Sequence, residues 1–191
     1  AISTILMMFE IPLPFAPAFY KLDFSELPIM IVTFAFGPVA GVLTEFIKIL
    51  LKVMFKSTST AFVGELANFC VGASLILPAS IIYIFNKTRN GALVGSITGT
   101  IIMTVFGSVF NAVYLLPKFA QLFGMDLNAI IGMGSAINPA VSNIQTFALM
   151  IVAPVNLLKG TLISTLTIVL YKKFSPVLKQ GKAFREVNMA K

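Results

Sequence analysis

The chain has 191 residues, of which 58% are hydrophobic and only 11% are charged, and its mean hydropathy is +0.95. This composition excludes a soluble globular domain, and the long continuous apolar runs exclude a spanning β-barrel, whose strands alternate apolar and polar residues. Because one crossing takes about 20 residues, the length allows about six helices. We therefore predict an all-α integral membrane protein that forms one domain of six transmembrane helices over residues 1–191.

The residue types that the chain lacks exclude several kinds of chemistry. It has no histidine and a single cysteine, Cys70, so that neither a disulfide within the chain nor a Cys/His metal cluster can form. A Ser-His-Asp triad is excluded for the same reason, and no G-x-x-x-x-G-K-[ST] loop is present to cradle a nucleotide. We expect no cofactor and no enzymatic activity, and any ATP hydrolysis that drives transport must occur on another subunit.

The breaks between apolar runs predict where the helices begin and end. Residues 1–9 form an apolar run that begins without Met, which we interpret as the end of a first helix truncated at its start. Three prolines in 11–17 begin a loop that runs to about Asp23, and Gly37-Pro38 marks a turn. The further predicted helices cover residues 24–36, 39–55, 61–85, 92–116 and about 143–171, with a long connection over 117–142 and a basic polar tail.

The distribution of lysine and arginine predicts the orientation. Basic residues collect in the turn around Lys87 and Arg89 and in the tail after Tyr171. The positive-inside rule places that turn and both termini in the cytoplasm, so that the first loop and the 117–142 connection face outward. The net charge of +7 therefore reflects topology and not nucleic-acid binding.

Polar residues three positions apart occur on four predicted helices, in the half that this orientation places outward. Such residues share a helix face, and at membrane depth they need partners or water. A shared outward-opening cavity satisfies all of them, whereas direct hydrogen bonds between helices, worth about 0.6 kcal/mol each, are the structural alternative. The pairs are Glu45/Lys48, Glu65/Asn68, Asn111/Tyr114 and Asn156/Lys159.

The last pair is the first candidate for a binding site. Lys159 lies inside the apolar stretch 147–170, where an ammonium group costs about 3 kcal/mol or more on insertion scales. Its own helix offers no acid to neutralise it, which favours contact with a ligand or a water-filled cavity. Glu45 and Lys48 can neutralise each other, so that for them a structural role and a binding role stand equally open.

Two segments of the chain resemble a known family. The residues Leu22-Asp23-Phe24-Ser25-Glu26-Leu27-Pro28, followed by Phe36-Gly37-Pro38-Val39-Ala40-Gly41, are similar to the second-helix region of the riboflavin-binding S components of bacterial energy-coupling factor (ECF) transporters. The length, the six-helix layout and the C-terminal Asn156-x-x-Lys159 extend this resemblance over essentially the whole chain.

The resemblance implies a substrate-binding subunit of the bacterial cell membrane, surrounded by lipid. Such a subunit works with a membrane-embedded coupling protein and two cytoplasmic ATPases. It also implies an Ala-x-x-x-Ala docking motif on the first helix, of which this sequence holds only the end around Ala1 and Ser3.

The resemblance further implies that riboflavin is the transported ligand rather than a cofactor. The riboflavin ring has an edge that alternates carbonyl, N–H and carbonyl, beside a chain of ribityl hydroxyls and an apolar dimethylbenzene end. Asparagine both donates and accepts hydrogen bonds whereas lysine only donates, so Asn156 and Lys159 suit the ring edge, assisted by Asn111 or Asn68. Glu45 and Lys48 suit the hydroxyls. The expected substrate-binding residues are Asn156, Lys159, Asn111, Tyr114, Asn68, Glu45, Lys48 and Asp23.

Other functions remain open at this point. An S component for another vitamin would have a similar sequence, and bound yellow flavin in the purified protein would distinguish the two. A stand-alone secondary carrier is a third possibility, which paired broken helices or an inverted repeat would favour, and the sequence displays neither. A membrane enzyme is disfavoured because the chain has no histidine and no nucleophile–base pair.

Overall fold

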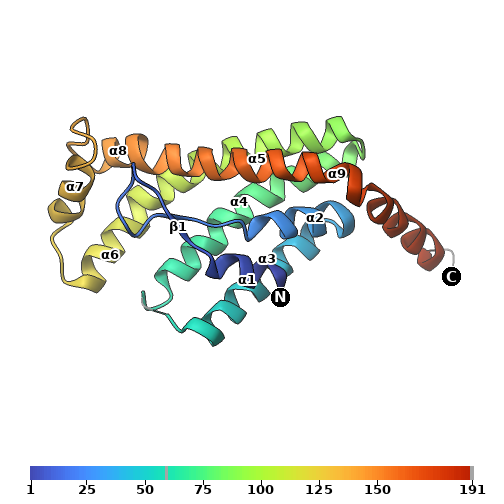
Figure 1. The fold of residues 1–191 in the computed structure, drawn as a ribbon, viewed down its shortest axis with the longest axis horizontal. Helices are drawn as coiled ribbons and strands as arrows, with labels where there is room; N and C mark the ends of the chain where they lie inside the picture. The colour runs from blue at the N-terminus through green and yellow to red at the C-terminus, as the bar shows by residue number, and fades with distance from the viewer. Residues whose placement is uncertain (59, 190–191) are drawn as a thin grey trace.

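The computed structural model describes residues 1–58 and 60–189, with side chains up to Tyr171 and at Lys173. Helices arranged along one long axis make up most of the molecule (Figure 1). The elements in chain order are α1 (Ile2–Met8), β1 (Ile11–Pro12), β2 (Lys21–Leu22), α2 (Glu26–Phe36), α3 (Pro38–Lys56), α4 (Val63–Phe85), α5 (Arg89–Phe110), η1 (Asn111–Leu115), α6 (Leu116–Phe123), α7 (Leu127–Ser135), α8 (Ile144–Phe147), η2 (Ala148–Val152) and α9 (Ala153–Met189).

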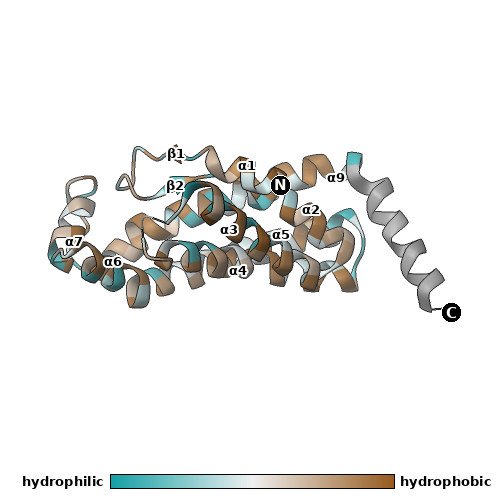
Figure 2. Cartoon of the chain, turned by 90° about the horizontal axis from the view of Figure 1, so that it is seen from below, coloured by the Kyte–Doolittle hydropathy of each residue, from teal (hydrophilic) through white to brown (hydrophobic). Residues whose placement is uncertain are grey.

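Among the described residues, three helices are long and apolar enough to cross a membrane. They are Val63–Phe85, the continuous helix Arg89–Phe123 and the helix Ile144–Tyr171. Glu26–Phe36 is apolar but shorter, and hydrophobic residues are spread over all of these helices (Figure 2). The predicted all-α class is confirmed, whereas the number of six crossings stays a prediction.

Small residues bring the long helices into close contact. At Gly95 and Gly99 of α5 a Cβ atom would meet the backbone carbonyl oxygens of Ala79 and Leu75 in α4. Because lipid provides no hydrophobic drive between helices, close packing of this kind is a main source of their association. The three long helices therefore form a tightly packed scaffold for the polar residues.

In the described part of the chain two π-helical turns interrupt the long helices, and each ends two residues before a proline. The turn η1 precedes Pro117, and η2 precedes Pro154. In an α-helix the proline ring would clash with the carbonyl group four residues earlier, and the wider π turn relieves this clash. Since η1 begins at Asn111 and η2 ends one helical turn before Asn156, both turns set the direction of a predicted site residue.

The connection predicted over residues 117–142 is largely helical. The helix predicted to end near residue 116 continues to Phe123, because the π turn η1 accommodates Pro117. α6 ends at Gly124, whose φ of +61° favours glycine, and Asp126 caps α7 by accepting from the backbone N–H of Asn128 at 3.1 Å. α9 likewise continues past Tyr171, where the sequence predicted a polar tail.

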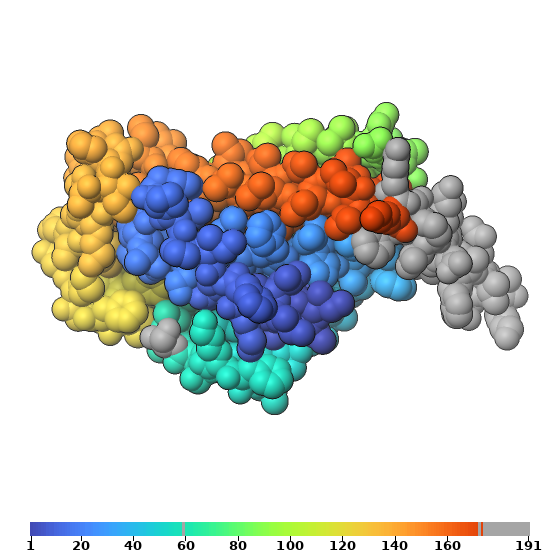
Figure 3. Space-filling model, in the orientation of Figure 1, coloured from blue at the N-terminus to red at the C-terminus, as the bar shows by residue number. Residues whose placement is uncertain are grey.

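The segment between α1 and α2 forms a hairpin beside the α7–α8 end of the bundle (Figures 1 and 3). Its two short strands pair antiparallel, with Ile11 opposite Leu22. Buried side chains of this segment, among them Leu13 and Leu22, pack in one apolar cluster with Phe147 and Ile151. The hairpin is thereby fixed against the first turns of the last helix.

Candidate functional site

A cavity of about 680 Å³ opens where the hairpin, α6–α7 and the α3–α4 connection meet. Small-molecule sites commonly measure about 300–1,000 Å³, so this cavity has the size of a ligand site. One wall is apolar and comes mainly from α6 and α7, with Phe119, Phe123, Met125, Ile130 and Met133. The opposite wall is polar, with Lys21, Asp23, Lys52, Lys56, Thr58, Thr60, Glu65 and Asn68.

A second cavity, of about 170 Å³, adjoins the first on the side of the long helices. The two cavities share Phe19, Lys21, Gly64, Asn68 and Phe119 as lining residues. The smaller one extends to a group of polar side chains on three helices and the hairpin, namely the half-buried Tyr20 and the buried Glu26, Asn111, Asn156 and Lys159. The predicted cavity shared by several polar helix faces is therefore present.

Lys159 is held at the inner cavity by two carboxylates that lie far away in sequence. Its Nζ atom is 3.0 Å from Asp23 Oδ2 and 3.0 Å from Glu26 Oε1. The backbone N–H of Ser25 also donates to Asp23 Oδ1 at 2.9 Å, which holds this carboxylate in place. An ammonium group has three protons, so that one proton of Lys159 is left for a ligand in the cavity.

Lys48 lies behind the cavity wall, with a side-chain exposure of 1%. Its Nζ atom has four acceptors: Glu45 Oε1 at 2.6 Å, Asn68 Oδ1 at 3.0 Å, Ser25 Oγ at 3.1 Å and Glu26 Oε1 at 3.3 Å. Three protons facing four acceptors leave nothing for a ligand. Glu26 Oε1 accepts from both lysines and so joins α3 to α9.

Two asparagines at the inner cavity have their amide orientation fixed by neighbours. Lys48 can only donate, so Asn68 must turn its oxygen toward Lys48 and its NH₂ group away from it. Asn111 donates from Nδ2 to the carbonyl of Gly107 at 2.7 Å and accepts from the Tyr20 hydroxyl at 2.7 Å. Burial raises the pKa of Tyr20, which keeps that hydroxyl protonated.

Asn156 differs from these two because its Nδ2 atom is buried and has no partner in the described part of the chain. A Cβ atom at Gly107 would meet this nitrogen, so that glycine there makes room for the amide. A buried amide without a partner costs free energy unless a ligand or water satisfies it. Asn156 is thus a lining residue of the inner cavity whose amide nitrogen the described chain leaves unsatisfied.

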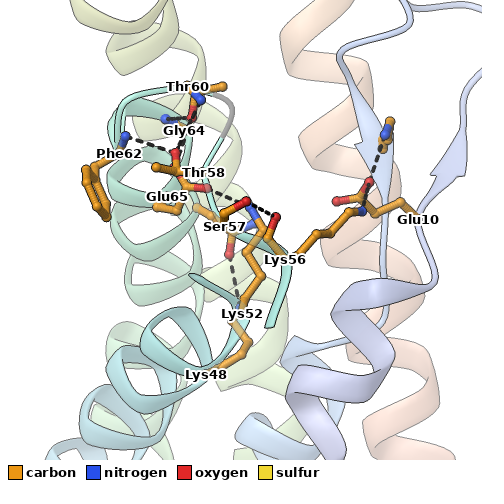
Figure 4. A network of polar contacts seen from close by, with 12 residues as sticks. Glu10, Lys48, Lys52, Lys56, Ser57, Thr58, Thr60, Phe62, Gly64 and Glu65 are labelled. Atoms are coloured by element: carbon orange, nitrogen blue, oxygen red, sulfur yellow. Dashed lines mark hydrogen bonds and ion pairs between the residues drawn. The ribbon is translucent and has the colours of Figure 1, made fainter. Parts of the chain in front are cut away.

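Ion pairs and threonine hydroxyls surround the mouth of the larger cavity (Figure 4). Glu65 accepts from Lys52 at 2.8 Å through Oε1 and from Thr58 and Thr60 at 3.0 and 2.9 Å through Oε2. Glu10 lies 2.7 Å from Lys21 and 3.5 Å from Lys56, which connects the hairpin to the end of α3.

The structure brings most of the predicted site residues together. Asn68, Asn111, Asn156, Lys159 and Asp23 line one cavity or the other. Glu45 and Lys48 are buried beside the cavity and do not line it, and the half-buried Tyr114 packs on Phe110 at a ring distance of 5.2 Å instead of pointing inward.

Sequence reasoning did not single out Glu26 or Tyr20 as site residues. Glu26 stands in the first turn of a short apolar helix, where a fully buried acid signals a cationic partner. Tyr20 follows a proline-rich loop that carries no periodic pattern, so nothing local to it predicts its contact with Asn111.

A family model for the substrate-specific component of ECF transporters matches residues 1–171. The chain belongs to this family. Among its relatives, the riboflavin transporter RibU of Staphylococcus aureus is 35% identical over 180 residues, covering 94% of this chain and 88% of the relative. The riboflavin transporter FmnP of Bacillus subtilis is 28% identical over 186 residues, covering 96% and 91%.

A solved S component of a bacterial ECF transporter has the same fold. It superposes with a TM-score of 0.71 and 34% identity over 93% of this chain and 91% of the solved chain. The relatives named above are transporters and not enzymes, in agreement with the absence of catalytic residue types from the sequence. The S component described here is therefore a membrane transport protein.

Proposed function

We propose that this S component binds riboflavin in the paired cavities and that the ring edge occupies the inner one. The observation that carries the proposal is the set of free hydrogen-bonding groups there. Lys159 has one spare proton, Asn68 presents its NH₂ group, and Asn156 has an unpartnered amide. The donors of Lys159 and Asn68 suit the two carbonyl oxygens of the ring edge, and the amide oxygen of Asn156 suits the N–H between them.

The remaining parts of riboflavin suit the larger cavity. Its apolar wall from α6 and α7 is suited to the dimethylbenzene end, and the hydroxyls of Thr58 and Thr60 lie on the polar wall, where ribityl hydroxyls would find partners. The names of two relatives, both riboflavin transporters, agree with this choice of ligand.

The wider arrangement that we propose follows from the family. The chain forms six crossings of the bacterial cell membrane with both termini in the cytoplasm, and the cavity opens outward. It delivers riboflavin through a membrane-embedded coupling protein and two cytoplasmic ATPases, since the sequence holds no phosphate-cradling loop of its own. Docking on that module uses closely packed small residues of the first helix, including Ala1.

Titration of the purified chain with riboflavin tests the proposed ligand. One-to-one quenching of flavin fluorescence without nucleotide is the expected result, because the cavity is built from the chain's own helices. Binding of thiamin, biotin or folate in place of riboflavin would assign the S component to another vitamin. Proton- or sodium-driven accumulation by the chain alone in vesicles would instead identify a secondary carrier.

A further inference from the structure

We propose that Lys48 is a positioning residue that sets the hydrogen-bonding pattern of the site through Asn68, without touching the ligand. This inference rests on the proposed riboflavin site and goes beyond it, because it assigns a role to a residue outside the cavity. The side chain of Lys48 is 1% exposed, and Asn68 stands between it and both cavities.

The contact with Lys48 fixes the direction of the Asn68 amide. Lys48 Nζ lies 3.0 Å from Asn68 Oδ1, and an ammonium group has no acceptor. The oxygen of Asn68 is therefore committed to Lys48, and the NH₂ group is the part that faces the ligand. Without the lysine, the amide can rotate and present either its oxygen or its nitrogen to the cavity.

Lys48 is itself held by acceptors on neighbouring elements. Glu45 and Glu26 contact it from α3 and α2 at 2.6 and 3.3 Å, and Ser25 Oγ lies at 3.1 Å. The carboxylate of Glu45 packs against Gly72 of α4, where a Cβ atom would come within 2.5 Å of Glu45 Oε1. Three helices thus fix the ammonium group, and the ammonium group in turn fixes the amide.

A double-mutant cycle on riboflavin affinity tests this role. Replacing Lys48 alone would leave buried acids without a counter-ion, so the background variant is Lys48→Met with Glu45→Leu, which removes a whole ion pair. In the native chain Asn68→Ala should weaken binding about five- to tenfold, the loss expected for one hydrogen bond. In the background variant Asn68→Ala should lower riboflavin affinity by less than about twofold, because no lysine orients the Asn68 amide there.

The matched control removes the Lys52–Glu65 pair at the cavity mouth by Lys52→Met with Glu65→Leu. This change leaves Lys48 on Asn68, so that Asn68→Ala should keep its full effect. An equal loss on Asn68→Ala with and without Lys48 would overturn the positioning role while leaving the proposed function intact. Failure of the native chain to bind riboflavin would overturn both.

A second measurement needs no change at Lys48. In protein labelled with ¹⁵N at asparagine, the side-chain NH₂ signals of Asn68, identified by their loss in Asn68→Ala, should shift when riboflavin is added. Unchanged Asn68 NH₂ signals in the presence of saturating riboflavin would show that this group does not face the ligand, which would overturn the inference even if the background variant does not fold.

Discussion

Lys48 and Lys159, the two lysines found buried among the described side chains, have similar surroundings and different tasks. Lys48 has four acceptors and lies behind the cavity wall, whereas Lys159 has two carboxylate partners and lines the inner cavity. Both contact the same oxygen, Glu26 Oε1. The number of acceptors around each ammonium group decides which lysine is left with a proton for a ligand.

The comparison also explains how two lysines are tolerated inside an apolar molecule. Asp23, Glu26 and Glu45 supply three carboxylates for the two ammonium groups. A buried ion pair stabilises only when its geometry and hydrogen bonds are nearly complete, and it is very sensitive to the loss of one partner. Changes at Lys48 should therefore affect folding first, and changes at Lys159 should affect binding first.

The largest effect is expected from Lys48→Ala. It leaves Glu45 and Glu26 with fewer counter-charges, and removing one partner of a buried pair costs about 3–5 kcal/mol of stability. Thermal unfolding in detergent should show a large decrease in the midpoint, while Lys48→Met combined with Glu45→Leu should unfold close to the native chain. A Lys48→Ala variant as stable as the native chain would contradict the claim that Lys48 is needed for folding stability.

Lys159→Ala should instead weaken riboflavin binding, by about 1.5–3 kcal/mol, the range for a charge-assisted hydrogen bond. In this variant Glu26 keeps Lys48, and Asp23 keeps the backbone N–H of Ser25 and lines the larger cavity, where water can reach it, so that stability should suffer less than in Lys48→Ala. Combining it with Asn156→Ala should give less than the sum of the two losses if both residues address one ring edge. Unchanged affinity in folded Lys159→Ala would return this lysine to a purely structural role.

Gly107→Ala should perturb Asn156 in the inner cavity without changing either buried lysine. The added methyl group would meet Asn156 Nδ2 and displace the amide from its place beside Gly107, while both lysines keep their partners. Riboflavin affinity should decrease by about 1 kcal/mol, the net worth of one hydrogen bond, with a small effect on unfolding. Gly132→Ala is the control, because a Cβ atom there meets nothing within 4 Å; equal binding losses in the two variants would contradict the account.

The smallest effect is expected at the mouth, from Glu10→Gln. Burial disfavours the charged form of Glu10, but the hydrogen bond and charge of Lys21 and the charge of Lys56 outweigh this and lower its pKa. The contribution to stability is therefore present above the pKa of the unfolded chain and is lost as pH falls through the folded pKa. A partly exposed pair contributes about 0–1 kcal/mol, so native and Glu10→Gln chains should differ slightly at pH 7 and converge in acid. A difference in their unfolding midpoints that grows in acid would contradict this.

Much of the fold could be predicted from the sequence because lipid-compatible helices are long apolar runs with clear breaks. The turn at Gly37-Pro38 lies where expected, because glycine favours the φ of +98° that the turn requires. The helix that ends at Phe85 also ends where expected, because a polar segment follows it in the sequence. Pro117 misled the prediction of the fifth helix, because the π turn that accommodates it has no sequence signature.

Residues of the candidate site could be predicted where a polar or charged side chain inside an apolar helix costs free energy unless it has a partner. Lys159 and Asn156 stand out inside an apolar stretch, and the structure places both at the inner cavity. The partners of Lys159 lie more than 130 positions earlier in the chain, with Asp23 separated from it by 136 residues. Contacts of that sequence separation depend on how the helices pack, and helix periodicity carries no information about them.

A structure of the complex with riboflavin tests the central claim most directly. The account predicts the ring edge in the inner cavity, with Lys159 Nζ and the Asn68 NH₂ group on its carbonyl oxygens and Lys48 still bonded to Asn68 Oδ1. Riboflavin bound outside these cavities, or in direct contact with Lys48, would contradict it.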